Sequence, residues 1–317
     1  MDNYQRKHKE LPKKHSVPLD PDDHPELDES KLLKTDDVKL YQSMIGALQW
    51  CITLGRFDIS CAVMCMSRFR TAPREGHLKR LHRIYGYLRK YPDAAIRFRT
   101  GIPKNEEIYK VEDKDWSDTV YGDFKEEFPK YYPVPKGKAV RTTTYCDANL
   151  MHCLVTGKSC TGIIHMVNQT VVDTYSKRQN TVETATYGSE FNAARTATEQ
   201  IIDLRLTLMS MGVPIDGPSW LLGDNKSVID SSTIPSSMLN KRHNALSYHR
   251  VRAAMAAKII KFGKIDGKEN PSDVCTKFLG HVPMFKLIGP LLFTRGETLT
   301  KEELSTSVAQ GSDKQNS

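Results

Sequence analysis

The chain has 317 residues, and its 46 lysines and arginines against 38 aspartates and glutamates give a net charge of +8. This length is enough for one or two domains with hydrophobic cores of their own. No uncharged apolar run approaches the roughly 18 residues of a membrane-spanning helix, and the polar, basic N-terminal residues lead us to expect no secretion signal. Seven cysteines without CxxC spacing favour free thiols in a reducing intracellular compartment, cytoplasmic or nuclear.

Residues 1–100 divide into an irregular stretch and a helical one. Residues 1–40 are charged, contain four prolines and show little periodicity, which predicts an extended lead-in. Residues 41–100 carry apolar side chains at helical spacing in three stretches, with a break at Thr71-Ala-Pro73. We therefore expect a small subdomain of three helices.

The helical stretch is also strongly basic. Residues 51–100 contain eleven lysines and arginines against three acidic residues, an excess equal to the net charge of the whole chain. Tyrosines 85, 87 and 91 lie among them. The pattern favours a surface that follows nucleic-acid phosphates, with Arg80 and Arg83 as candidate contacts. A solvated helix face is the plainer alternative.

The second half of the chain predicts a compact α/β domain at residues 141–295. An acidic, proline-bearing linker is expected at 101–140, and a disordered tail at 296–317. Strands are expected at 142–147, 161–167, 170–175, 219–223 and 258–265, with a tight turn at Asn168-Gln169. Helices are expected at 184–211 and 245–257, and a last one from Pro271.

Four carboxylates occupy informative positions in this domain. Glu190 lies in the apolar stripe of the helix expected at 184–211, where an unpaired buried charge is costly and requires a cation. Asp147 and Asp224 each stand at the carboxyl end of an expected strand, where open α/β sheets place their sites. Asp273 falls in the first turn of the last helix. Taken singly, Asp273 also suits a helix cap and Asp224 a turn.

An ordered set of short motifs resembles the carboxyl-terminal part of copia-type retrotransposon polyproteins. Tyr41-Gln-Ser-Met-Ile-Gly-Ala-Leu-Gln49 with Arg56-Phe-Asp-Ile59 resembles the thumb and connection region that follows the reverse-transcriptase palm. The motifs that resemble the family's ribonuclease H domain are Asp147-Ala-Asn149, Thr161-Gly162, Ser176-Lys-Arg-Gln179, Thr184-Ala-Thr-Tyr-Gly-Ser-Glu190-Phe191, Gly223-Asp-Asn-Lys-Ser-Val228, Lys241-Arg-His243, Tyr248-His-Arg-Val-Arg252, and Asn270-Pro-Ser-Asp273 with Thr276-Lys277. Each motif is weak alone, whereas their order over residues 17–295 is specific.

The resemblance implies a ribonuclease H-like α/β fold, with a mixed five-stranded sheet in the order 3-2-1-4-5, flanking helices and a preceding helical thumb/connection subdomain. It implies that Asp147, Glu190, Asp224 and Asp273 are catalytic and hold two Mg²⁺ or Mn²⁺ ions, oxygen ligands being those that hard cations prefer. Asp147 would bridge the ions, with Asp273 on the side opposite Glu190 and Asp224. One departure is that the first acid is followed by Ala148-Asn149-Leu150, which lacks the neighbouring acid common in the family.

The expected activity is cleavage of the RNA strand of RNA–DNA hybrids, with the hybrid and the rest of a retroelement polyprotein as partners. Lys177 and Arg178 precede the Glu190 helix and are expected to contact phosphates. Lys241, Arg242, His243 and His249 are also candidate nucleic-acid contacts. The two histidines have two alternative roles. They could shuttle protons during product release, or they could simply lie at a helix end without a functional role.

Other functions fit the sequence less well. No Tyr-x-Asp-Asp turn is present, because the two Asp-Asp pairs fall at residues 22–23 and 36–37, so no polymerase activity is expected. A catalytically silent, connection-type nucleic-acid-binding module or a decayed retroelement fragment is the main alternative, and retention of all four acids favours the nuclease over it. A transposase or integrase core needs three acids and leaves the thumb-like segment unexplained.

Overall fold

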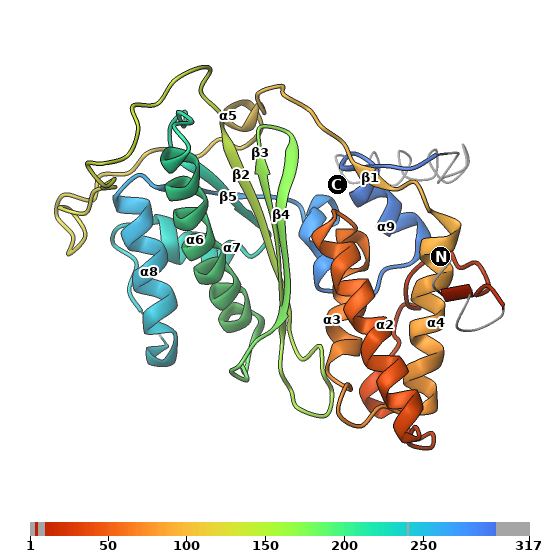
Figure 1. Cartoon of the computed structure of the whole chain (residues 1–317). Helices are drawn as coiled ribbons and strands as arrows, with labels where there is room; N and C mark the ends of the chain where they lie inside the picture. Colours follow the sequence, from red (N-terminus) through yellow and green to blue (C-terminus); the bar gives the residue numbers. More distant parts are fainter. Residues whose placement is uncertain (1–3, 6–9, 240, 296–317) are drawn as a thin grey trace, which may run out of the picture. The chain divides into compact units, whose positions relative to one another are not determined.

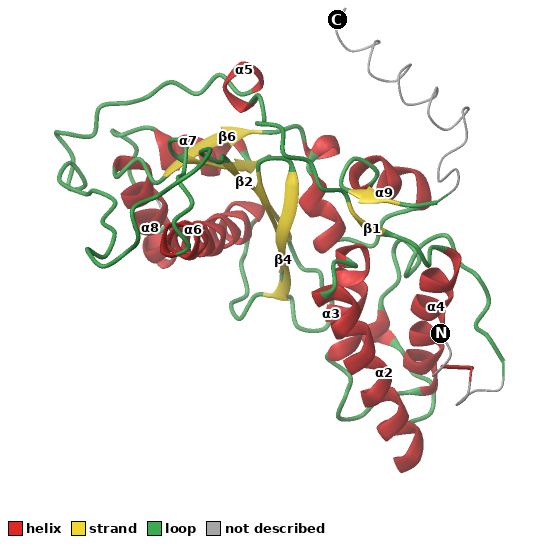
Figure 2. Cartoon of the chain, turned by 45° about the horizontal axis from the view of Figure 1, so that its top comes forward, coloured by secondary structure: helices red, strands yellow, loops and turns green. Residues whose placement is uncertain are grey.

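The computed structural model describes residues 4–5, 10–239 and 241–295, and these form two compact units. The first unit contains the chain up to Arg97 together with the residues from Phe278 onward, and the second runs from Phe98 to Lys277. Figures 1 and 2 show the elements of both. The tail expected at 296–317 lies outside the described residues. Within the described part of the chain, no helix is both long and apolar enough to cross a membrane.

The first unit is built on three helices that pack side by side (Figure 2). They are α2 (Thr35–Thr53), α3 (Ser60–Ser67) and α4 (Glu75–Lys90), with short 3-10 helices η1 (Pro25–Leu27) and η2 (Phe57–Ile59). Their apolar faces are buried, as the helical spacing of the sequence requires. Strand β1 (Ala95–Ile96) pairs antiparallel with β7 (Leu292–Phe293), which follows α9 (His281–Ile288).

The stretch expected to be an extended lead-in is part of this unit. Helix α2 begins at Thr35, inside the predicted lead-in, and Val17 and Leu19 are buried. The chain before it runs so close to α4 that a Cβ on Gly86 would lie 2.0 Å from the Lys13 carbonyl oxygen. Only glycine fits this approach. The polar composition of residues 1–40 predicted an extended segment, whereas part of this segment packs on the helices of the first unit.

The second unit contains a five-stranded mixed sheet. Its strands are β2 (Thr142–Asn149), β3 (Cys160–Val167), β4 (Thr170–Arg178), β5 (Ser219–Gly223) and β6 (Ile260–Lys264), arranged in the order β4-β3-β2-β5-β6. The β2–β3 and β3–β4 pairs are antiparallel, and the β2–β5 and β5–β6 pairs are parallel. Counted along the chain, the order is 3-2-1-4-5. The expected ribonuclease H-like sheet is therefore confirmed.

Three helices pack against one face of the sheet: α6 (Thr186–Ser210), α7 (Lys226–Thr233) and α8 (Ala245–Ala256) (Figure 1). Strand residues that alternate along β2, β5 and β6 point into this core, among them Cys146, Leu221 and Phe262. Helix α7 was not anticipated from the sequence. Its N-cap is Asn225, whose side chain accepts a hydrogen bond from the Val228 main-chain N–H.

The opposite face of the sheet is covered by residues that the sequence suggested were a linker. Trp220, Leu222 and Ile265 form a second core, against which Tyr109 and Val111 pack. The segment 98–140 also contains the short helix α5 (Asn105–Ile108). Its apolar residues are few and widely spaced in an acidic stretch, so periodicity did not mark them. The segment belongs to the second unit and does not separate two domains.

Two aromatic residues of this segment, together with Tyr248 of α8, surround one arginine of the same helix. The Arg252 guanidinium lies 4.8 Å from the ring centre of Trp116, 5.3 Å from that of Tyr121 and 4.8 Å from that of Tyr248. Such stacking is favourable when the cation is withdrawn from water, and Arg252 is only 2% exposed. The arginine thereby holds the segment on α8.

The domain boundary expected at residue 295 also differs from the structure. Residues 278–295 belong to the first unit, because β7 pairs with β1 and Phe285 of α9 stacks near Tyr91. The helix expected from Pro271 is instead a five-residue 3-10 helix, η5 (Pro271–Cys275). Its N-cap is Asn270, whose side chain accepts hydrogen bonds from the Ser272 main-chain N–H and hydroxyl. Two further 3-10 turns are η3 (Arg242–Asn244) and η4 (Gly267–Glu269).

Candidate metal centre

Asp147 and Asp224 come together because their strands are parallel neighbours. The register pairs Tyr145 of β2 with Leu222 of β5, and each aspartate follows two residues later on its own strand path. The carboxyl ends of adjacent parallel strands lie at one edge of a sheet, where ligand sites form. Asp147 is 1% exposed, whereas Asp224 is partly buried.

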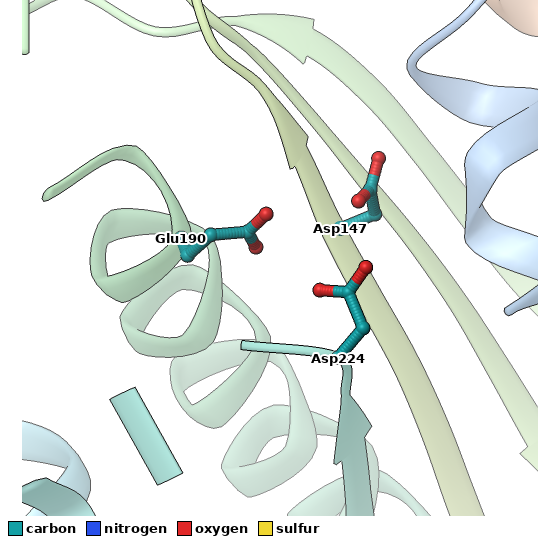
Figure 3. A group of neighbouring side chains, drawn as sticks. All are labelled: Asp147, Glu190 and Asp224. Carbon is teal, nitrogen blue, oxygen red and sulfur yellow. The ribbon is translucent and has the colours of Figure 1, made fainter. Parts of the chain in front are cut away.

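Glu190 reaches the same place from α6. It lies on the helix face that also carries Phe191 and Ala194 into the core, and it is 7% exposed. One carboxylate oxygen from each of Asp147, Glu190 and Asp224 lies within 4.8 Å of the others. Figure 3 shows the three carboxylates pointing toward one another. The structure therefore brings together three of the four acids singled out in the sequence, and their catalytic role stays a prediction.

Asp273 lies beside Asp147, and the two carboxyl groups share a lysine as their charged partner. The Lys277 ammonium nitrogen is 2.7 Å from Asp273 Oδ1 and 3.4 Å from Asp147 Oδ2. It therefore joins the fourth acid to the first, while the close group of three does not include Asp273. Sequence reasoning assigned no role to Lys277, although its position four residues after Asp273 is a spacing typical of ion pairs.

Two close approaches bring η5 to the sheet. The Thr276 hydroxyl donates a hydrogen bond to Asp147. Gly162, the residue opposite Asp147 on β3, has no side chain to obstruct this segment. A Cβ there would lie 2.7 Å from the Ser272 carbonyl oxygen and 2.8 Å from Cys275 Cβ. The Thr161-Gly162 motif therefore has a steric basis.

The proximity of the acids raises the pKa of several of them. Burial, followed by the negative charges of Asp147 and Asp224, raises the pKa of Glu190 well above its ordinary value. Burial and Asp147 likewise raise the pKa of Asp224. Burial and Asp147 raise the pKa of Asp273 to about 7, although Lys277 opposes the shift. When all four acids are ionised, their negative charges outnumber the single positive charge of Lys277.

Oxygen ligands of this kind fit a hard divalent cation. Three carboxylates from β2, α6 and the end of β5 converge, and neither thiolate nor imidazole belongs to the set. A bound cation would stabilise the buried charge of Glu190 and offset its repulsion by Asp147 and Asp224, the two effects that raise its pKa. The residues present therefore fit a magnesium- or manganese-type site.

Lys177 and Arg178 lie at the same end of the sheet as the acids. Gly162, which pairs with Asp147 on one side, pairs with Ser176 of β4 on the other, and the two basic residues follow Ser176. Together with Arg195 of α6 they line a polar cleft. The contact of Lys177 and Arg178 with nucleic acid stays a prediction, and their position near the acids is compatible with it.

Three of the four basic candidates near α8 contact other residues of the protein. The Lys241 ammonium lies 5.7 Å from the ring centre of Tyr187. His243 Nε2 is 3.5 Å from Glu183 Oε2. His249 Nδ1 is 2.6 Å from the hydroxyl of Tyr121. Arg242 is exposed. The functional roles expected for these residues stay predictions.

In the first unit, the two predicted phosphate contacts bind acids of the preceding segment. Arg80 lies 2.7 Å from Asp23 and 2.6 Å from Asp28, and Arg83 lies 2.5 Å from Asp20. These ion pairs hold residues 20–28 on α4. Any contact with phosphate would have to compete with them.

The strand order, the flanking helices and the clustered acids define this unit as a ribonuclease H-like domain. No family model matches the chain. The chain is 26% identical over 237 residues to a retrovirus-related Pol polyprotein from transposon TNT 1-94 of Nicotiana tabacum, a match that covers 75% of this chain and 15% of the relative. It is 38% identical over 65 residues to a putative transposon Ty5-1 protein of Saccharomyces cerevisiae, covering 20% of this chain and 21% of that protein.

These relatives confirm the resemblance to retrotransposon polyproteins. The chain spans about a fifth or less of the length of either one. Among solved structures, the N-terminal RNase H domain of a Mycobacterium tuberculosis protein is similar over 48% of this chain and 98% of that one, with 12% identity and a TM-score of 0.34. The fold assignment rests on the strand order described above.

Proposed function

We propose that this protein is a metal-dependent ribonuclease H-type endonuclease that cleaves the RNA strand of RNA–DNA hybrids. The observation that carries the proposal is the convergence of Asp147, Glu190 and Asp224 within 4.8 Å at one edge of a ribonuclease H-like sheet. The similarity to retrotransposon polyproteins supports the same activity. Reverse transcription leaves RNA paired with DNA, which is the substrate that such an activity removes.

The acids would divide their roles by position. Asp147, Glu190 and Asp224 would hold one Mg²⁺ or Mn²⁺ ion, and Asp147 with Asp273 would hold a second. Bound divalent cations lower the pKa of water and neutralise the charge that develops on a phosphodiester and its leaving oxygen. The Thr276 hydroxyl orients Asp147, and Lys177 and Arg178 would contact the hybrid backbone beside it.

A cleavage assay tests the proposal. The full chain is incubated with a labelled RNA–DNA hybrid, an RNA duplex or single-stranded RNA, with magnesium or with a chelator. We expect cleavage of the hybrid RNA only, and only with the metal. Asp147→Asn should abolish it, because the change removes a ligand charge with almost no change in volume. Metal-independent cleavage, or full turnover by Asp147→Asn, would refute the assignment.

A non-catalytic hybrid-binding module is the second candidate. The observation that favours it is the Lys277 ammonium, which already pairs with Asp147 and Asp273. This candidate predicts hybrid binding with no cleavage at any magnesium concentration, and equal binding by the native protein and Asp147→Asn.

A further inference from the structure

We propose that the Lys277 side chain is an exchangeable internal cation, which occupies the place between Asp147 and Asp273 that a second divalent ion would take. The inference rests on the proposed function, because it concerns the metal occupancy of the same site. In this proposal the chain has two metal positions. The first binds a metal ion readily, and the second binds one only when the Lys277 side chain has moved away.

The position of the ammonium carries the inference. Its nitrogen lies 2.7 Å from Asp273 Oδ1, 3.5 Å from Asp147 Oδ1 and 3.4 Å from Asp147 Oδ2. A divalent ion shared by these carboxylates would stand about 2.0–2.6 Å from the same oxygens. Two cations cannot share that space, since both steric overlap and charge repulsion oppose it. Metal and Lys277 must therefore alternate there.

In the first metal position, Lys277 forms an ion pair with only one of the three acids, Asp147. This position is formed by Asp147 with Glu190 and Asp224, which come from α6 and from the end of β5. Asp273, by contrast, has Lys277 as its charged partner in the cluster. Asp147 is thus common to two groups: the three acids of the first position, and the pair that it forms with Asp273, which Lys277 bridges.

The main chain around Lys277 is fixed, so that only its side chain is free to exchange. The Lys277 main-chain N–H donates to the Asp273 carbonyl oxygen at 2.9 Å. The preceding residue, Thr276, donates to Asp147 through its hydroxyl and accepts from Asn149 through its carbonyl at 3.2 Å. The side chain itself is 35% exposed. Rotation of the lysine arm into solvent would vacate the position without displacing the backbone.

Manganese binding tests the inference without reference to activity. The full-length protein and its variants are titrated with Mn²⁺ and followed by calorimetry and by the paramagnetic resonance of the free ion. For the native protein we expect one ion to bind at least about tenfold more tightly than a second. In Lys277→Met the second ion should bind at least about tenfold more tightly than in the native protein, because its competitor is gone.

Two variants serve as matched controls. Lys277→Arg keeps a cation on the same residue and should leave the second ion weak. Lys264→Met removes an exposed lysine of β6 whose charge acts on Asp224 from a distance, and it should reproduce the native titration. An equal gain in Lys264→Met would mean that the general charge of the site, and not occupancy by Lys277, sets the affinity. That result would overturn the inference.

A second measurement uses only the native protein, so it holds even if Lys277→Met folds poorly. Reductive methylation followed by peptide mass spectrometry reports how accessible each lysine amine is. Saturating magnesium should raise the labelling of Lys277 relative to Lys264 at least about fivefold over the chelator-treated protein, because the metal expels the lysine arm. Unchanged or decreased labelling would overturn the inference.

The outcomes also separate this inference from the proposed function. Two ions bound with equal affinity by both the native protein and Lys277→Met would defeat the inference and leave the metal-dependent nuclease standing. If neither the native protein nor Asp147→Asn bound any Mn²⁺, both the inference and the proposed function would be refuted.

Discussion

The Asn270 side-chain amide donates a hydrogen bond to the Cys146 carbonyl oxygen at 3.0 Å. Cys146 immediately precedes Asp147 on β2, and Asn270 is the N-cap of η5, which carries Asp273. This bond therefore connects the first and fourth acids through the main chain. Asn270 is fully buried, so the bond lies in the protein interior.

Asn270→Ala should consequently impair both stability and turnover. Removal of the side chain leaves the Cys146 carbonyl and the Ser272 N–H unpaired, at a cost of about 2–3 kcal/mol in the free energy of unfolding. It also releases η5, so kcat should fall at least about tenfold with little change in KM. Urea unfolding and hybrid-cleavage kinetics measure the two effects.

Asn105→Ala is the control for this loss. Asn105 is also buried, and its side chain donates to the Thr143 hydroxyl at 2.7 Å, away from the acids. It should cost a similar free energy of unfolding and leave kcat unchanged. Equal losses of turnover in both variants would show that Asn270 affects activity through global stability alone.

The metal-free protein should become less stable as the pH rises from about 4 to about 7. Folding raises the pKa of Glu190, and raises that of Asp273 to about 7, whereas unfolded carboxyls titrate near pH 4. The folded state therefore binds more protons in this window, and the free energy of unfolding falls as they dissociate. Saturating magnesium should oppose the trend, because it binds the deprotonated acids.

Glu190→Gln isolates one contribution to this pH dependence. The neutral amide removes a buried charge from α6, so the metal-free variant should be about 1–2 kcal/mol more stable than the native protein at pH 7.5 and should show a flatter pH profile. Urea unfolding in chelator at several pH values provides the measurement. A native free energy of unfolding that increases from pH 4 to 7 would contradict the pKa assignment.

Gly162→Ala should separate η5 from the sheet. The added Cβ would meet the Ser272 carbonyl oxygen and Cys275 Cβ at distances no real side chain adopts. The segment must then shift, and we expect a loss of about 2–3 kcal/mol in the free energy of unfolding and a large decrease in kcat. Gly46→Ala, whose Cβ would meet no atom within 4 Å, should be neutral or stabilising. Native-like turnover by Gly162→Ala would refute this role of η5.

Lys177→Gln combined with Arg178→Gln should weaken hybrid binding through the loss of phosphate contacts. Each lost contact reduces the slope of log affinity against log salt concentration by about 0.7–0.9, so the double variant should have a slope shallower by about 1–2. Sequence preference should not change, because phosphate contacts carry none. Binding isotherms across a salt series decide the matter, and parallel slopes would exclude the contact.

Arg80→Gln provides a contrasting test of the basic helical segment. Arg80 is held by Asp23 and Asp28 in the first unit, so its replacement should destabilise the packing of residues 20–28 on α4 and lower the melting temperature. If Arg80 also contacts phosphate, as the charge excess of residues 51–100 suggests, the salt slope becomes shallower as well. An unchanged slope with a lower melting temperature would assign Arg80 to structure alone.

Much of the second unit is determined by local sequence. Three features depend on residues only two to four positions apart: the alternation of residues 142–147, the turn at Asn168-Gln169 and the apolar stripe of α6. Such local patterns can be recognised in the sequence alone. Glu190 can be identified from the sequence for the same reason, because it is a charged residue within an otherwise apolar stripe of the helix. The ends of β2 and β5 likewise marked Asp147 and Asp224.

Tertiary structure decided what joins these elements. The alignment of Tyr145 with Leu222 brings two aspartates together, and the approach of η5 to Gly162 brings Lys277 to Asp147 across 130 residues of sequence. The packing of residues 98–140 on the sheet is of the same kind. Contacts over such separations arise only when apolar surfaces are buried together, and their energy depends on shape and register that no local pattern contains. The candidate acids were therefore evident from the sequence, whereas the lysine that pairs with two of them emerged only in the folded chain.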